Sequence, residues 1–145
     1  DFIVGEYQIV EAWAHGADAV LLIAAALDDF QMKDLCDAAH SYGLTVLCEA
    51  HDEREIERAL SLPDVAIGVN ARDLRDFTVS LERTASLAPM IPADRMRVGE
   101  SGIFSNEDAR KLVDAGYNAL LIGEYFLKSE DRQSAVSSLV NSIKR

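Results

Sequence analysis

Polar residues that could take part in acid–base chemistry close several short apolar runs of this sequence. Glu49 and Asn70 each follow a run of hydrophobic residues, and Glu100-Ser101 and Gly123-Glu124 close two further runs. Ligands of parallel α/β folds are held at the carboxyl ends of the strands. Four polar strand ends that share one rim therefore predict a functional site.

Glu49 is the candidate general base. We expect its carboxylate to point into the mouth of a barrel, where partial loss of water makes a carboxylate a stronger base. The alternative is a solvent-exposed acid that begins the next turn. Asn70 offers a donor and an acceptor that could orient a substrate hydroxyl or a neighbouring carboxylate. Glu100 is a second acid in the same mouth, where two adjacent carboxyl groups ionise at different pH, or it fixes a lysine from another strand.

Two glycine-bearing loops follow the last two predicted strands and could hold a phosphate group. They are Ser101-Gly102-Ile103 and Gly123-Glu124. Backbone N–H groups can approach an anion closely where no side chain intervenes, and barrels bind phosphate after their seventh and eighth strands. The alternative is that both glycines only make tight turns.

Arg72 has two possible roles. Its planar guanidinium group could pair with Glu49, with Glu100 or with a substrate carboxylate. The alternative is an ion pair within its own loop, with Asp73 or Asp76.

The histidines and cysteines show no metal-ligand spacing. His51 is expected in a loop or at a helix start rather than as a catalyst, and His15 and His40 are expected at the surface. Cys36 and Cys48 lie among apolar neighbours, so we expect reduced thiols in the core.

The overall composition excludes some classes of partner. The 145 residues carry a formal net charge of −11, which disfavours nucleic acid. A small phosphorylated substrate remains compatible, because a local array of N–H groups can hold it. No run approaches the ~18 apolar residues of a membrane span, and no leader is evident, so a cytoplasmic protein without a membrane partner is expected.

The apolar runs are continuous, which is typical of parallel strands buried on both faces. The predicted strands are residues 20–23, 45–48, 65–69, 96–99 and 119–123. Helical periodicity predicts helices at 6–15, 29–42, 52–60, 106–115 and 133–143. Gly16, Gly43 and Gly116 are expected to end helices in the left-handed conformation.

These elements form βα units in a single domain, residues 1–145. Residues 15–23 and 115–123 are nearly the same sequence, an internal repeat that indicates winding in one direction. Five such units could form a free-standing doubly wound sheet or part of an eight-stranded barrel. Composition and period do not choose between them.

Six segments together resemble indole-3-glycerol-phosphate synthase, in that family's order and spacing. They are Asp1-Phe2-Ile3 with Tyr7-Gln8-Ile9, Gly16-Ala17-Asp18-Ala19-Val20-Leu21-Leu22-Ile23, Leu47-Cys48-Glu49-Ala50-His51, Ile67-Gly68-Val69-Asn70-Ala71-Arg72-Asp73-Leu74, Gly99-Glu100-Ser101-Gly102-Ile103 and Leu121-Ile122-Gly123-Glu124. The resemblance implies the last five βα units, strands 4–8, of a TIM-barrel lyase of tryptophan biosynthesis. That enzyme closes an indole ring with loss of carbon dioxide and water, and uses no metal or organic cofactor.

The resemblance also implies roles for individual residues. Glu49 corresponds to the general base of the dehydration step and Asn70 to its orienting partner. Further active-site and substrate-binding positions are Glu100, Ser101, Gly102, Ile122, Gly123, Glu124 and Arg72.

The departure from the family concerns lysines. The family has a general-acid lysine directly before the segment that begins here at Asp1, and a glutamate and a lysine on its first strand. The chain alone is therefore expected to be inactive. We expect the missing portion of the barrel as another chain, self-association through open sheet edges, or rearrangement into a flavodoxin-like sheet. Two other interpretations remain open: a non-catalytic phosphate-binding half-barrel, and another phosphate-binding barrel isomerase, for which paired aspartates or a cysteine would be expected at strand ends.

Overall fold

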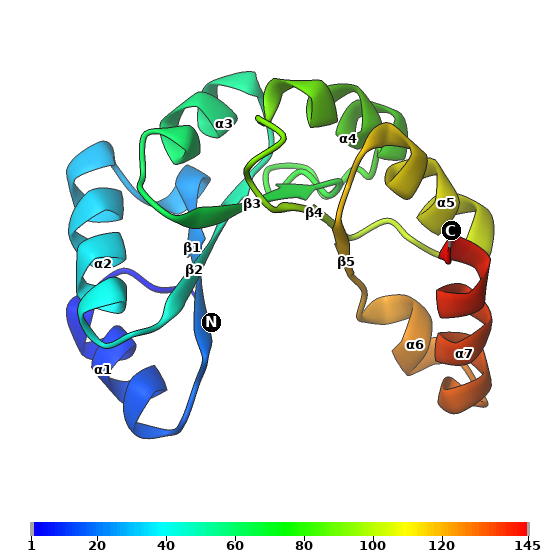
Figure 1. Cartoon of the computed structure of the whole chain (residues 1–145), viewed down its shortest axis with the longest axis horizontal. Helices are drawn as coiled ribbons and strands as arrows, with labels where there is room; N and C mark the ends of the chain where they lie inside the picture. The colour runs from blue at the N-terminus through cyan, green and yellow to red at the C-terminus, as the bar shows by residue number, and fades with distance from the viewer. Residues whose placement is uncertain (1, 145) are drawn as a thin grey trace.

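The structure is a computed structural model that describes residues 2–144 and contains one parallel sheet. Five strands lie side by side in the order in which they occur along the chain. They are β1 (Ala19–Ile23), β2 (Thr45–Ala50), β3 (Val65–Asn70), β4 (Arg97–Glu100) and β5 (Ala119–Leu121). The sheet curves into an open arch, with the strands on the concave side and the helices on the convex side (Figure 1).

Helices separate successive strands, and the apolar periodicity predicts them for every interval except the one between β3 and β4. They are α1 (Glu6–Ala14), α2 (Asp29–Ser41), α3 (Glu53–Leu60), α4 (Leu81–Leu87), α5 (Asn106–Ala115), α6 (Glu124–Lys128) and α7 (Arg132–Ile143), with 3-10 turns at Ala24–Ala26 and Ala88–Met90. Neither α4 nor α6 is among the predicted helices. No helix within residues 2–144 is long and apolar enough to cross a membrane.

Local signals in the sequence explain where the helices begin and end. The side chains of Asp28 and Asp52 each accept a hydrogen bond from the backbone N–H three residues later, which satisfies a free donor of the first turn. Gly16, Gly43 and Gly116 have φ values of 82°, 73° and 108°, so the predicted left-handed helix ends are confirmed.

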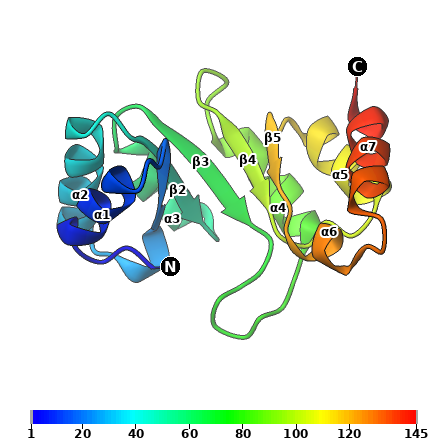
Figure 2. The same cartoon turned by 90° about the horizontal axis from the view of Figure 1, so that it is seen from below.

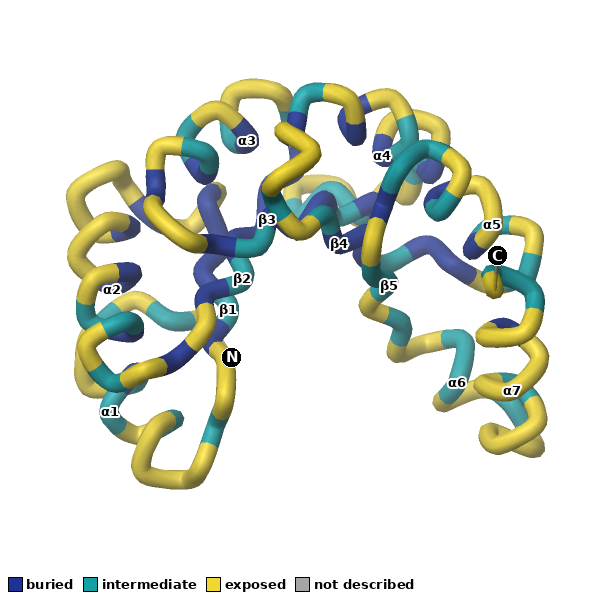
Figure 3. Tube along the Cα trace, viewed as in Figure 1, coloured by how far each residue is buried: buried dark blue, intermediate teal, exposed yellow. Residues whose placement is uncertain are grey.

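Side chains alternate between the two faces of the sheet. Val46 and Cys48 on β2 are fully buried beneath the helices, whereas Leu47 between them is only partly buried on the concave side. The main core therefore lies between the sheet and the outer helices, as the buried trace in Figure 3 shows. Cys36 and Cys48 are both buried free thiols, as predicted.

The strand order decides between the two sheet architectures. A flavodoxin-like sheet has the order 2-1-3-4-5 and helices on both faces, whereas this sheet runs 1-2-3-4-5 with its helices on one side. The expectation of a rearranged sheet is therefore wrong, because each βα unit packs beside the preceding one in a single direction. The result is five consecutive units of a barrel wall, with β1 and β5 at its edges.

Strand lengths differ from the predictions at two places that matter for the site. Strand β2 extends to Ala50, because Glu49 and Ala50 pair with Gly68 and Val69. Strand β5 stops at Leu121, the partner of the last residue of β4, so residues 122 and 123 have no strand beside them.

Candidate functional site

The side chains of Glu49 and Glu100 meet over an intervening strand. In the register of the sheet Glu49 lies beside Gly68 on β3, and Glu100 on β4 lies beside Asn70. A Cβ atom added to Gly68 would lie only 1.8 Å from Oε1 of Glu100, so the carboxyl group of Glu100 occupies the space above this glycine. The missing side chain thus lets two glutamates from strands β2 and β4 come together.

Both carboxyl groups are almost completely buried: Glu49 is 5% exposed and Glu100 is 2% exposed. Burial raises the pKa of Glu100 to about 8, and the adjacent carboxylate of Glu49 contributes to this rise. At neutral pH Glu100 therefore holds a proton. The pair combines one carboxylic acid with one group able to accept a proton.

Asn70 ends β3 next to this pair, as predicted, but its carbonyl group is already engaged. Oδ1 accepts a hydrogen bond of 3.0 Å from the backbone N–H of Arg72. This contact positions the start of the β3–α4 segment, which projects beyond the end of β3 in Figure 2.

The predicted phosphate-binding residues line one cavity of about 310 Å³. Its walls are formed by Arg72, Ser101, Gly102, Ile103, Phe104, Leu121, Ile122, Gly123 and Glu124. The cavity therefore lies at the carboxyl ends of β4 and β5, close to Glu100, and it includes all six residues predicted for substrate or phosphate binding.

The two glycines of this cavity are present for different reasons. Gly102 has φ 68° and follows Ser101 with φ 61°, so two left-handed residues make a sharp turn after β4. A Cβ on Gly102 would also come within 2.6 Å of Val79. Gly123, by contrast, has φ −112°, which any residue adopts, and a Cβ there would meet no atom within 4 Å. Of the two, Gly123 is the one that leaves space that the fold itself does not need.

Arg72 pairs with none of the protein side chains expected from the sequence. Its Nη2 lies 3.0 Å from Oε2 of Glu124, so the ion pair joins the β3–α4 segment to α6 beside the cavity. Asp73 is instead engaged by Arg75, at 2.7 Å. The contacts with Lys128 and Arg72 hold the pKa of Glu124 below its usual range.

His51 is more closely tied to the carboxyl pair than the sequence indicates. It lies between β2 and α3, as expected, but is only 6% exposed. Its Nδ1 donates to Oε2 of Glu55 at 3.0 Å, and its Nε2 lies 3.4 Å from Oε1 of Glu49. The one available signal was a glutamate four residues after the histidine, at the spacing of neighbouring positions on a helix.

The remaining histidines are not part of this cluster. His15 is exposed, as predicted, whereas His40 is half-buried against Cys36. Within residues 2–144 no group of three or more His, Cys, Asp or Glu side chains could hold a metal ion.

Comparison with protein families identifies the chain. The family model described as indole-3-glycerol phosphate synthase matches residues 1–139. The chain belongs to the indole-3-glycerol phosphate synthase family. The predicted resemblance is thereby confirmed.

Relatives with that name agree closely in sequence. The protein from Variovorax paradoxus (strain S110) is 52% identical over 139 residues, which cover 96% of this chain and 52% of the relative. The protein from Burkholderia cenocepacia (strain HI2424) is 53% identical over 130 residues, which cover 90% and 50%. The chain thus spans about half the length of these indole-3-glycerol phosphate synthases.

Solved structures with little sequence similarity share the fold. 3-Hexulose-6-phosphate synthase from Salmonella typhimurium aligns with a TM-score of 0.81 at 13% identity and covers 98% of this chain and 69% of that one. Orotidine 5'-phosphate decarboxylase from Pyrococcus horikoshii OT3 aligns with a TM-score of 0.72 at 13% identity, over 95% of this chain and 66% of that one. These matches agree with five βα units of a TIM barrel.

Proposed function

We propose that this chain supplies the general base, its acidic neighbour and the phosphate site of an indole-3-glycerol phosphate synthase. Such an enzyme converts 1-(2-carboxyphenylamino)-1-deoxyribulose 5-phosphate into indole-3-glycerol phosphate, with loss of carbon dioxide and water. One observation carries the proposal: the buried Glu49–Glu100 pair lies next to a cavity bordered by Gly102 and Gly123 at the carboxyl ends of neighbouring strands.

The carboxyl pair suits the dehydration that follows ring closure. In this step the substrate loses one proton and one hydroxide, together a molecule of water. Glu49 accepts the proton from the substrate, and Glu100, which holds a proton at neutral pH, donates a hydrogen bond to the substrate. The departing hydroxyl group takes a proton from the general-acid lysine of the family, which the rest of the barrel would supply, and leaves as water. Asn70 presents its amide group beside the pair and orients a substrate hydroxyl. General acid–base catalysis of this kind contributes about 100- to 10,000-fold to a rate.

The cavity of about 310 Å³ suits the phosphate group of the substrate. Backbone N–H groups of residues 101–103 and 122–124 bind the phosphate oxygens, and the open space at Gly123 admits them. Arg72 supplies a cation when its pairing with Glu124 loosens. The net charge of −11 does not oppose this local site.

We further propose that this chain is inactive by itself. Its lysines make contacts away from the carboxyl pair: Lys33 with Asp37, Lys111 with Glu82, Lys128 with Glu124 and Lys144 with Asn141. The chain spans about half the length of its relatives, and none of the four lysines within residues 2–144 lies at the carboxyl pair. The open edges at β1 and β5, and Leu121 with 48% exposure, fit completion by the other barrel strands or by a second copy of the chain.

Complementation tests the proposal. The chain is combined with the N-terminal half of the Variovorax paradoxus relative, and this combination is called the completed protein below. Formation of indole-3-glycerol phosphate is then measured. We expect turnover only in the completed protein, and a loss of about 100- to 10,000-fold in Glu49→Gln.

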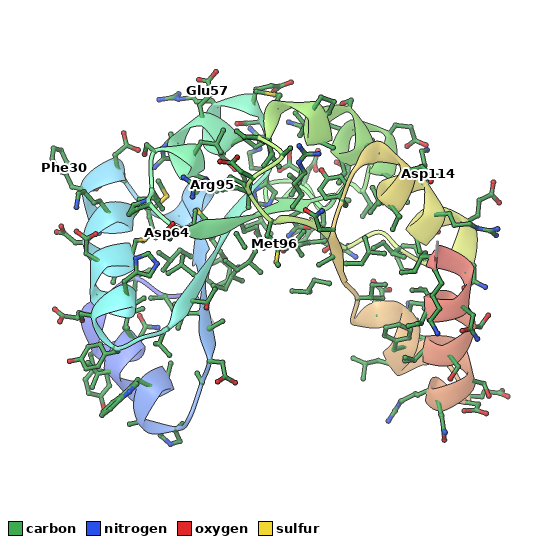
Figure 4. All side chains as sticks on the ribbon, in the orientation of Figure 1. Phe30, Glu57, Asp64, Arg95, Met96 and Asp114 are labelled. Atoms are coloured by element: carbon green, nitrogen blue, oxygen red, sulfur yellow. The ribbon has the colours of Figure 1, made fainter. Side chains whose placement is uncertain are left out.

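Glu57→Gln is the matched control, because Glu57 is exposed on the outer side of α3 (Figure 4). Its turnover should equal that of the unmodified protein. Turnover that survives Glu49→Gln would refute the proposed base. Phosphate binding without any turnover would favour a non-catalytic binding module.

A further inference from the structure

Four ionisable side chains form a continuous row that begins outside the catalytic pair; His51, Glu49 and Glu100 are buried and Glu55 is half-buried. Glu55 of α3 contacts His51, His51 contacts Glu49 of β2, and Glu49 contacts Glu100 of β4. The proposed chemistry uses only the last two. The first two therefore need an explanation, because burying ionisable groups is unfavourable unless they are paired.

Glu55 holds the imidazole ring of His51 in one orientation. Its Oε2 accepts two hydrogen bonds, one of 3.0 Å from Nδ1 and one of 2.8 Å from the backbone N–H of His51. Asp52, the residue before α3, accepts a hydrogen bond from the backbone N–H of Glu55 and anchors this turn. With Nδ1 committed to Glu55, the other ring nitrogen is left for Glu49.

The contact between His51 and Glu49 joins two buried atoms. Nε2 of His51 and Oε1 of Glu49 are 3.4 Å apart, and neither atom makes a hydrogen bond to another described residue. The separation is longer than a normal hydrogen bond but short enough for a strong electrostatic interaction. A proton on Nε2 would satisfy both atoms at once.

We propose that His51, fixed by Glu55, is a positioning residue that keeps Glu49 ionised, so that the base remains competent below neutral pH. This inference rests on the proposed role of Glu49. As an imidazolium ion, His51 offsets the burial of the Glu49 carboxylate and the presence of a second carboxyl group beside it. Of the two carboxyl groups, Glu100 then carries a proton, and the ionised Glu49 accepts a proton from the substrate.

The charges around His51 support its protonated form. The charges that raise its pKa come from Glu49 of β2, Glu55 of α3 and Asp73 of the β3–α4 segment. Arg54, Arg58 and Arg75 line the same cavity as His51, where Arg58 pairs with Asp29 and Arg75 with Asp73. Burial lowers the pKa of His51, but the hydrogen bond to Glu55 and these three negative charges outweigh it, so the net shift is upward. The ring also borders a cavity of about 430 Å³, through which it can exchange protons with solvent.

The pH dependence of kcat/KM in the completed protein tests the inference. This profile reports groups of the free enzyme. An opposite charge at this range changes ionisation by about 1–3 pH units. The acid limb is the part of the profile where kcat/KM falls toward low pH. We therefore expect His51→Gln to move this limb to higher pH by about that amount, with little change in the maximal kcat/KM. Below the limb, kcat/KM should fall about tenfold for each pH unit by which the limb moves. His15→Gln, which removes an exposed histidine, should leave the profile unchanged.

A second measurement does not depend on turnover. The chain has three histidines, so ring-nitrogen NMR of the labelled chain in the completed protein reports His51 once His15→Gln and His40→Gln assign the others. Glu49→Gln should lower the midpoint of His51 by the same number of pH units that His51→Gln moves the acid limb, because the coupling is reciprocal. Glu55→Gln should also lower this midpoint.

The outcomes separate the two proposals. If His51→Gln reduces kcat/KM equally at every pH and Glu49→Gln leaves the His51 midpoint in place, His51 has only a structural role and the inference is overturned. If the histidine midpoint moves but turnover survives Glu49→Gln, the coupling is real and the proposed function of Glu49 fails.

Discussion

Gly68→Ala is the substitution that the geometry of the carboxyl pair predicts most sharply. The added methyl group would lie 1.8 Å from Oε1 of Glu100, 2.9 Å from its carboxyl carbon and 3.2 Å from Cδ1 of Leu47. Real Cβ contacts are essentially never as short as the first of these, so the carboxyl group of Glu100 must leave its place beside Glu49. The substitution changes no charge and no hydrogen-bonding side chain, so its effects report displacement alone.

Two magnitudes follow. Overpacking a buried site destabilises by about 1–3 kcal/mol, and the free energy of unfolding should fall by that amount. A carboxyl group that leaves the buried pair also loses the two influences that raise the pKa of Glu100 to about 8. The midpoint of the Glu100 titration should therefore fall by at least about one pH unit.

Gly99→Ala is a matched control on the next strand. Its methyl group would lie 2.8 Å from Cδ1 of Leu112, on the helix-covered side of β4 and away from the carboxyl pair. We expect a comparable loss of stability in urea denaturation, but no change in the carboxyl titration of Glu100 followed by ¹³C NMR. If Gly68→Ala leaves the Glu100 midpoint near 8, the reasoning about the glycine gap is wrong.

Three further substitutions test other contacts. The pKa of Glu100 is about 8 in the folded protein and 4.5 for an ordinary glutamate, so its proton stabilises the folded form and the free energy of unfolding should decline as pH rises from about 4.5 to about 8. The decline should amount to a loss on the order of a few kcal/mol, and Glu100→Gln should remove it. The free energy of unfolding, measured at about pH 5 and again at about pH 8.5, reports the decline. Gly123→Ala should weaken binding of inorganic phosphate severalfold by calorimetry with unchanged stability, because its methyl group enters only the cavity; equal affinity would exclude a ligand at this position. Tyr117→Phe removes the buried hydrogen bond of 2.7 Å to the carbonyl oxygen of Thr84 and should lower the thermal transition by an amount equivalent to about 1 kcal/mol; an unchanged transition would show that this bond contributes no net stability.

The strands and most helices could be predicted because their signals are local. Continuous apolar runs, capping aspartates and glycines at helix ends each act within a few residues of the chain, and all are present here. The apolar pattern does not predict helix α4, because its seven residues follow a long loop and offer only two turns of periodicity. The choice between a doubly wound sheet and part of a barrel could not be made from period alone, since both sheet architectures use the same βα unit.

The candidate site was only partly predictable. Residues at strand ends could be named because parallel strands bring their carboxyl ends to one edge, and the cavity beside β4 and β5 is lined by Ser101, Gly102, Gly123 and Glu124, which follow those two strands. The partners were harder to foresee. Arg72 meets Glu124, 52 residues away, and His51 is buried between two glutamates. Such pairings depend on the curvature and register of the sheet, which no local pattern contains.

The strictly sequential strand order also has a consequence for how the arch forms. Register partners are separated by 26, 19, 30 and 21 residues along the chain, so every strand pairing closes a loop of similar length. The entropy of loop closure grows only slowly with length, so these four steps differ by less than about 1 kcal/mol in that entropy. Each unit therefore adds to a preformed neighbour, as in a solenoid repeat. Folding can begin at any pair of adjacent units and spread in both directions. The outer edges of β1 and β5 then present the backbone groups with which a further barrel strand could pair.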